Sequence, residues 1–156
     1  MKTAEELLQE KGSHIITVSP DTPMQEVLRT MVEKHIAAML VAEKGKIVGI
    51  WSDRDLLRDV LNPVFDPKTT RIGDVMVKSL PTAPHTDTIF QLKDKFLGKK
   101  VRHLLITKDG EYIGLLSVGD VLINSLLEKD DELTQLNARC NWNYYEDWQR
   151  WRKKKK

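Results

Sequence analysis

The sequence carries an internal repeat at an offset of 65 residues. The two copies align without a gap from Thr17 to Leu57, and their apolar positions match even where identities are few. A repeat constrains the architecture before any single motif does, so we expect two copies of one supersecondary unit. One unit of about 60 residues buries too little surface to be stable alone, so the two should share a core. The identical pairs are Thr17 and Thr82, Gly45 and Gly110, Gly49 and Gly114, Ser52 and Ser117, and Asp55 and Asp120.

Both copies predict the element order strand, helix, strand, strand, helix, which makes the fold class α/β. In the first copy, Thr22 can cap a helix that begins at Pro23, because an apolar stripe at helical spacing follows. Short apolar runs on either side of a Gly-containing turn predict the hairpins. The expected strands are 15–18, 37–42, 47–51, 80–83, 103–107 and 112–116, and the expected helices are 22–32, 52–61, 88–97 and a last one from 117.

Four segments follow from these patterns. Thr3 and Glu6 form a capping box for a short N-terminal helix, and Gly12 ends it. Residues 63–71 contain two prolines and predict a fixed connection between the repeats. The expected divisions are an N-terminal helix at 1–12, a first repeat at 13–70, a second repeat at 71–129 and a helical, aromatic and basic tail at 130–156.

The repeat contains two copies of the motif Gly-x-x-Ser-x-x-Asp, at 49–55 and 114–120. Each copy follows a strand and opens a helix, where free backbone N–H groups and the helix dipole favour an anion such as phosphate. The serine hydroxyl can add a hydrogen bond, and the aspartate on the first turn can accept both hydroxyls of a ribose. The leading glycine lets a ligand approach the backbone closely. Together these features indicate a nucleotide site.

The same spacing has a structural interpretation. Ser-x-x-Asp is also a capping box, in which the two side chains satisfy the N–H groups of their own helix. A single copy would favour capping, whereas two copies at one fixed offset favour a ligand site. Repetition could also preserve a structural cap, so the motif alone leaves both interpretations open.

The motif pair resembles the CBS domain family. Residues 34–41 and 101–106 are similar to the family's middle strand, and 16–20 to its opening strand; the resemblance spans roughly 12–128. It implies two repeats packed as a pseudo-twofold module with two clefts, which often hold AMP, ATP, NAD or another adenosyl ligand.

The resemblance also implies roles for individual residues. Arg54 could pair with phosphate in the first site, although helix-surface arginines are usually solvated. The second site has Gly119 at that position and offers Arg102 and His103 instead, where His103 could equally be a polar residue at a strand end. By the resemblance, Asp55 and Asp120 would hold ribose, Ser52 and Ser117 would reach phosphate, Thr17 and Thr82 would lie near the sugar or phosphate, and Ala38 and His103 would lie beside the nucleotide.

Composition and motifs disfavour several classes of protein. Apolar residues make up 40% and charged residues 31%, the balance of a soluble globular chain. We find no Gly-rich phosphate loop or paired nucleophile, so we expect no catalysis and no catalytic cofactor. The four histidines lack metal-ligand spacing, so we expect no metal site. The single cysteine and the lack of an apolar N-terminal segment fit a cytoplasmic protein.

The C-terminal segment is aromatic and basic. From Arg139 to Lys156, seven basic residues face Glu146 and Asp147, giving +5 against a whole-chain charge of +2 and leaving the rest at about −3. Three of the four tryptophans lie there. Such a segment suits single-stranded nucleic acid or an anionic membrane surface. We favour the alternative that its aromatics pack on the module or a partner subunit.

The sequence therefore predicts a non-catalytic sensor that binds an adenine nucleotide such as AMP, ATP or NAD. We expect a homodimer and an effector protein that the sequence does not identify. Two alternatives stay open: a nucleic-acid-binding or membrane-associated protein that acts through its tail, and a structural dimerisation module with empty clefts.

Overall fold

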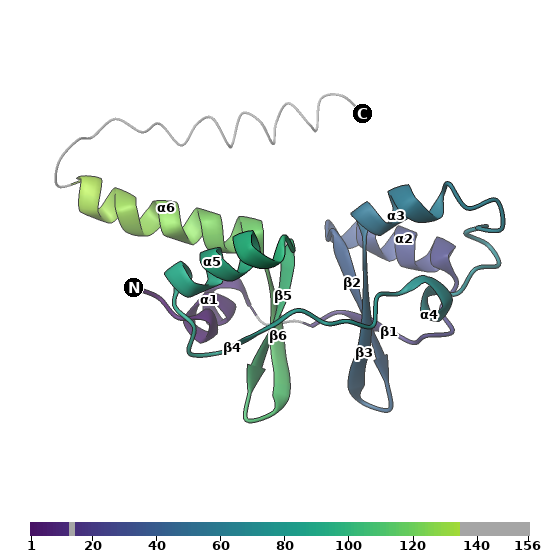
Figure 1. Ribbon diagram of the computed structural model, residues 1–156, viewed down its shortest axis with the longest axis horizontal. Helices are drawn as coiled ribbons and strands as arrows, with labels where there is room; N and C mark the ends of the chain where they lie inside the picture. The colour runs from purple at the N-terminus through teal and green to yellow at the C-terminus, as the bar shows by residue number, and fades with distance from the viewer. Residues whose placement is uncertain (13–14, 135–156) are drawn as a thin grey trace. The chain divides into compact units, whose positions relative to one another are not determined.

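The computed structural model describes residues 1–12 and 15–134. The chain divides into two compact units, of which Met1–Asn124 holds both repeats and the second begins at Ser125. Each repeat forms one three-stranded sheet, as the repeat predicted (Figure 1). Most of the predicted tail lies outside the described residues. None of the helices in the described ranges is long and apolar enough to span a bilayer.

The first repeat has the predicted order of elements. Strand β1 pairs in parallel with β2, and β2 pairs antiparallel with β3. Lys44 and Gly45 close the hairpin with φ of 50° and 77°, the left-handed geometry of a two-residue turn that follows the twist of its strands. The elements are β1 (Thr17–Val18), α2 (Met24–Lys34), β2 (Ala38–Glu43), β3 (Lys46–Ser52) and α3 (Asp53–Asp59).

The second repeat reproduces the first in detail. Its sheet has the order β4-β5-β6, again with a parallel and an antiparallel pair. A register shift follows Val41 in β2 and Ile106 in β5, which lie 65 residues apart. The elements are α4 (Ile72–Val75), β4 (Thr82–Pro84), α5 (Ile89–Lys99), β5 (His103–Lys108), β6 (Glu111–Ser117) and α6 (Val118–Thr134). The sequence analysis missed only the four-residue helix α4.

The prediction that Thr22 caps the first long helix is wrong. Helix α2 begins after Pro23, and no side-chain hydrogen bond caps it. Its first free N–H groups bind the linker instead: Met24 N donates to Thr70 O at 2.9 Å and Gln25 N to Pro67 O at 2.7 Å. Backbone carbonyls therefore satisfy donors that a threonine would otherwise cap. The same bonds hold the linker against the first repeat.

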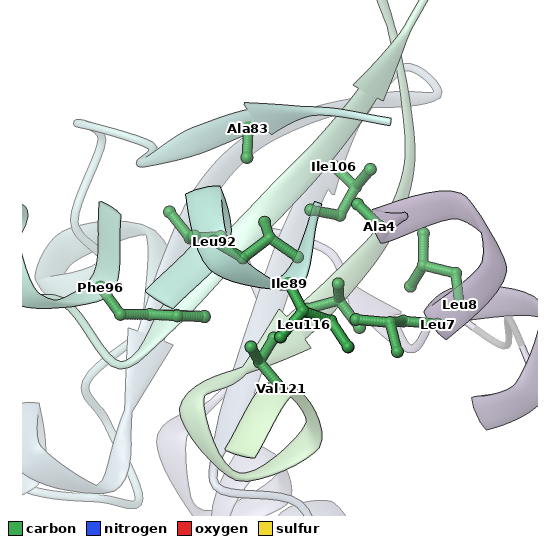
Figure 2. Packing of buried hydrophobic residues seen from close by; sticks show 11 residues of the cluster. Ala4, Leu7, Leu8, Ala83, Ile89, Leu92, Phe96, Ile106, Leu116 and Val121 are labelled. Carbon is green, nitrogen blue, oxygen red and sulfur yellow. The ribbon is translucent and has the colours of Figure 1, made fainter. Parts of the chain in front are cut away.

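The helix that precedes each repeat packs on the other repeat. Helix α1 (Ala4–Lys11) is capped as predicted by Thr3 and Glu6, and it ends at Gly12. Ala4 N donates to Asp87 O at 2.7 Å, and Figure 2 shows Ala4 and its neighbours on α1 among buried side chains of the second repeat. That core consists of Ala4, Leu7, Leu8, Ala83, Ile89, Leu92, Phe96, Leu104, Ile106, Leu116 and Val121.

Helix α4 makes the matching contact with the first repeat. Ile72 is fully buried in the first repeat's core. Its backbone N donates to Thr22 O at 3.0 Å, and Gly73 N donates to Pro20 O at 2.8 Å. A further apolar cluster joins residues of both sheets: Ala38, Leu40, Ile50 and Leu105. The two repeats thus share a core, as the size of one unit required.

Candidate functional site

Two cavities lie between the repeats. The larger, here named the Asp120 cavity, has a volume of about 340 Å³. The end of α1, the start of β2 and the junction of β6 with α6 form its walls. Of the predicted ligand-binding residues, Ala38, His103, Ser117 and Asp120 line it. The other lining residues are Leu8, Lys11, Gly12, Ile15, Ile16, His35, Ile36, Ala37, Leu40, Gly114 and Leu115.

The smaller cavity, named the Asp55 cavity, has a volume of about 190 Å³. Five predicted residues line it, namely Ser52, Arg54, Asp55, Arg102 and His103. They come from the junction of β3 with α3 in the first repeat and from the start of β5 in the second. The remaining wall residues are Ile50, Val77, Ser79, Pro81, Lys100 and Val101.

The offset of 65 residues relates the two cavities. It places Asp55 on Asp120 and Ser52 on Ser117. Ala38 of the Asp120 cavity corresponds to His103, which lines both cavities. The internal repeat therefore produces two equivalent sites that differ in their side chains.

Two predicted residues lie outside these walls. Thr17 is in β1, where it pairs with Leu40, and Thr82 is in β4, where it pairs with Leu105. Neither threonine lines the Asp120 or the Asp55 cavity. Their roles near a sugar or phosphate stay predictions.

Both Ser-x-x-Asp motifs form capping boxes. In the second repeat, Asp120 Oδ2 accepts from Ser117 N at 2.7 Å and from Ser117 Oγ at 2.8 Å, while Asp120 N donates to Ser117 Oγ at 3.2 Å. In the first, Asp55 Oδ2 accepts from Ser52 N at 2.8 Å and from Ser52 Oγ at 3.1 Å. The structural interpretation of the motif is therefore correct, and a ligand role must use the carboxylate that the cap has already positioned.

Lys11 holds Asp120 from another part of the chain. Its ammonium lies 2.7 Å from Asp120 Oδ2 and donates to Leu115 O at 3.1 Å. Burial by itself raises the pKa of Asp120, but the bond from Lys11 and those from Ser117 outweigh it and lower that pKa. The contacts converge on Oδ2, which leaves Oδ1 as an acceptor for a ligand. The sequence analysis missed Lys11, because only the packing of α1 on the second repeat brings it here.

Asp55 has a different partner. Arg58 donates to Asp55 Oδ1 at 3.2 Å and through Nε to Asp59 Oδ1 at 2.9 Å. The bond to Asp59 and the two acidic charges raise the pKa of Arg58 despite partial burial. Asp59 is itself buried and accepts from Trp51 Nε1 at 2.8 Å. Both oxygens of Asp55 are thus engaged within the first repeat.

The cavities differ in charge. With histidines counted as neutral, the charged groups that line the Asp120 cavity are Lys11 and Asp120, which balance. The Asp55 cavity has three cations against Asp55: Arg54, Lys100 and Arg102. Burial, and then the charge of Arg102, lower the pKa of His103, so the imidazole shared by both cavities favours its neutral form.

The motif glycines serve packing. A Cβ on Gly114 would lie 2.6 Å from a methyl group of Leu8, and one on Gly49 would lie 2.3 Å from the sulfur of Met76. The close approach that we predicted for a ligand is therefore made by side chains near α1 and α4. The prediction of a ligand contact at these glycines is wrong for Gly49, which lines neither cavity, while Gly114 also borders the Asp120 cavity.

The chain matches known proteins along both repeats. The family model described as CBS domain matches residues 6–62 and 72–126. The chain is 28% identical over 139 residues to the mitochondrial CBS domain-containing protein CBSX3 of Arabidopsis thaliana, which covers 85% of the chain and 66% of that protein. It is 29% identical over 109 residues, or 69% of its length, to the inosine-5′-monophosphate dehydrogenase of Thermoplasma acidophilum, of which it spans only 21%.

Solved structures agree with this match. The crystal structure of a CBS domain superposes with a TM-score of 0.72 at 32% identity, covering 80% of the chain and 98% of that structure. CBSX2, solved in complex with AMP, superposes with a TM-score of 0.67 at 25% identity, covering 83% and 99%.

The Lys11–Asp120 pair predicts a pH-dependent contribution to stability. Because folding lowers the pKa of Asp120, the pair should stabilise the fold above the ordinary aspartate value of 3.8 and lose this effect as pH falls below it. In a double-mutant cycle with Lys11→Met and Asp120→Asn, we expect a coupling free energy of about 0.5–1 kcal/mol at pH 7, since the pair is partly exposed. Urea denaturation at pH 7 and at low pH measures it.

Lys108→Met supplies the control, because Lys108 pairs with Glu5 on the same helix at 2.6 Å. Its combination with Asp120→Asn should be additive. A coupling of Lys11 with Asp120 that is zero at pH 7, or unchanged at low pH, would contradict the assignment.

Proposed function

The chain belongs to the CBS domain family, and we propose that it is a regulatory module that binds an adenine nucleotide between its two repeats. Pairs of CBS domains are regulatory modules. The observation that carries the proposal is the Asp120 cavity, whose walls combine the capped Ser117 and Asp120 of one repeat with Ala38 of the other. The complex of CBSX2 with AMP supports the ligand class.

The Asp120 cavity suits a nucleoside better than the Asp55 cavity does. Its volume of about 340 Å³ compares with about 190 Å³. Its apolar wall, which includes Ile16, Ile36 and Leu115, would cover a base, and Oδ1 of Asp120 would accept from a ribose hydroxyl. In the Asp55 cavity, Arg58 already occupies the equivalent oxygen. We therefore propose the Asp120 cavity as the principal nucleotide site.

Regulation would follow from the position of the cavity. A ligand there touches both repeats, so it can favour one packing of the repeats over another. It does so only to the extent that it binds one packing more tightly. We propose no catalytic activity, and we propose that an effector protein senses the change in the cytoplasm. The alternative of nucleic-acid or membrane binding depends on tail residues outside the described chain and stays a prediction.

We expect AMP to raise the stability of the protein. A ligand at 100 times its dissociation constant should add about 2.7 kcal/mol to the free energy of unfolding. Asp120→Asn should weaken AMP binding by about 1.5–3 kcal/mol, because it removes a charged acceptor. Calorimetric titration and thermal unfolding of ligand-free protein measure both effects.

The matched control is Asp109→Asn, which makes the same change in the exposed turn between β5 and β6 and should leave binding unchanged. If Asp120→Asn lowers the melting temperature yet binds AMP like the parent, the carboxylate only caps its helix. Melting curves that no adenosyl ligand moves at millimolar concentration would refute the proposed function.

A homodimer is supported by apolar side chains exposed at equivalent positions of the two repeats. Val32 on α2 and Leu97 on α5 are 66% and 77% exposed, and Leu57 on α3 and Leu122 on α6 are 69% and 46% exposed. Such residues are normally covered when several lie together. Because the repeat places them in matching sets, a second copy related by a twofold axis could cover both sets at once. We propose a second copy of this chain as the occupant.

This proposal predicts a dimer that single charges disrupt. Leu57→Glu and Leu97→Glu should each shift the protein to a monomer at micromolar concentration, as measured by light scattering, because each would bury an unpaired carboxylate in the interface. Val64→Glu is the control, since Val64 is 83% exposed in the linker outside these helices. A parent protein that is already monomeric would show that something other than a second copy covers these residues.

A further inference from the structure

The end of helix α1 introduces a cation into the Asp120 cavity. Lys11 is the last residue of α1, and it lines the cavity beside Gly12. Leu7 and Leu8 are buried in the second repeat's core, so the helix that carries Lys11 is anchored on the repeat that supplies Asp120. The position of this lysine is therefore fixed by packing at its helix.

The ammonium of Lys11 is also oriented by two bonds. It donates to Asp120 Oδ2 at 2.7 Å and to Leu115 O at 3.1 Å. An ammonium has three N–H donors, so one remains for a ligand without loss of either bond. A charge that is already in place costs less to order on binding than a mobile surface lysine does.

Lys11 controls the sign of the charge in the cavity. With histidines neutral, the charged lining residues are Lys11 and Asp120, so the walls carry no net formal charge. Removal of Lys11 would leave a net charge of −1. A partly enclosed cavity of this kind repels anions and attracts cations, because its charges are screened less than surface charges are.

The first repeat has no cation at the equivalent place. The residue 65 positions after Lys11 is Met76, whose side chain packs over Gly49. Val77, the counterpart of Gly12, lines the Asp55 cavity as Gly12 lines the other. The lysine is thus a difference between two otherwise equivalent sites and is not required by the repeat itself.

We infer that Lys11 is a specificity-determining residue, which makes the Asp120 cavity select a phosphorylated nucleoside over an uncharged or a cationic adenosyl ligand. This inference rests on the proposed function, because it concerns the ligand of the same cavity. Adenosine, AMP and S-adenosylmethionine share a base and a ribose but differ in charge, so they separate the effect of Lys11 from that of the remaining walls.

Calorimetric titration of the full chain with these three ligands tests the inference. The parent should bind AMP at least about tenfold more tightly than adenosine, the size of one charge-assisted contact. Lys11→Met, which installs the residue of the first repeat, should bring AMP and adenosine to within about twofold and should tighten S-adenosylmethionine. Lys11→Arg should keep the preference for AMP, and Lys11→Gln repeats the neutral substitution should the methionine variant fail to fold.

Lys108→Met is the matched control, since it removes the other ion pair that α1 makes with the second repeat without altering the cavity walls. It should leave all three affinities as in the parent. An AMP-to-adenosine ratio that Lys11→Met and Lys11→Gln do not change would overturn the inference while leaving nucleotide binding in place. Failure of the parent to bind any of the three ligands would overturn the proposed function as well.

Discussion

The structure depends on the fact that neither repeat completes its own core. Each sheet has only three strands, and the helix before each repeat fills the core of the other repeat. Ile72 of α4 is fully buried in the first repeat, as Leu7 of α1 is in the second. Because both crossings must form together, the two repeats fold as one unit with cavities at their junction.

The crossing of the helices also makes the two cavities unlike. Repetition alone would give two equal sites with a capped aspartate in each. Helix α1 adds Lys11 to one site, where it leaves Asp120 Oδ1 available. In the other, Arg58 engages the remaining oxygen of Asp55 and links it to the buried Asp59. One site therefore combines space with an available acceptor, whereas the other is smaller and strongly cationic.

Local patterns allowed much of this to be predicted. The offset of 65 residues, the glycines of the hairpins and the Ser-x-x-Asp spacing depend on neighbours in the sequence. Arg58 could also have been found, because it lies three residues after Asp55 on a predicted helix. Lys11 could not, since its contact with Asp120 spans 109 residues and arises from the packing of α1. The cap of α2 was mispredicted for the same reason, as distant linker carbonyls replace the Thr22 side chain.

A crystal structure of the full chain grown with AMP tests the central claim most directly. The account predicts the nucleotide in the Asp120 cavity, with a ribose hydroxyl on Asp120 Oδ1 and the Ser117 cap intact. An empty Asp120 cavity in crystals soaked to saturation, or AMP bound only in the Asp55 cavity, would contradict it.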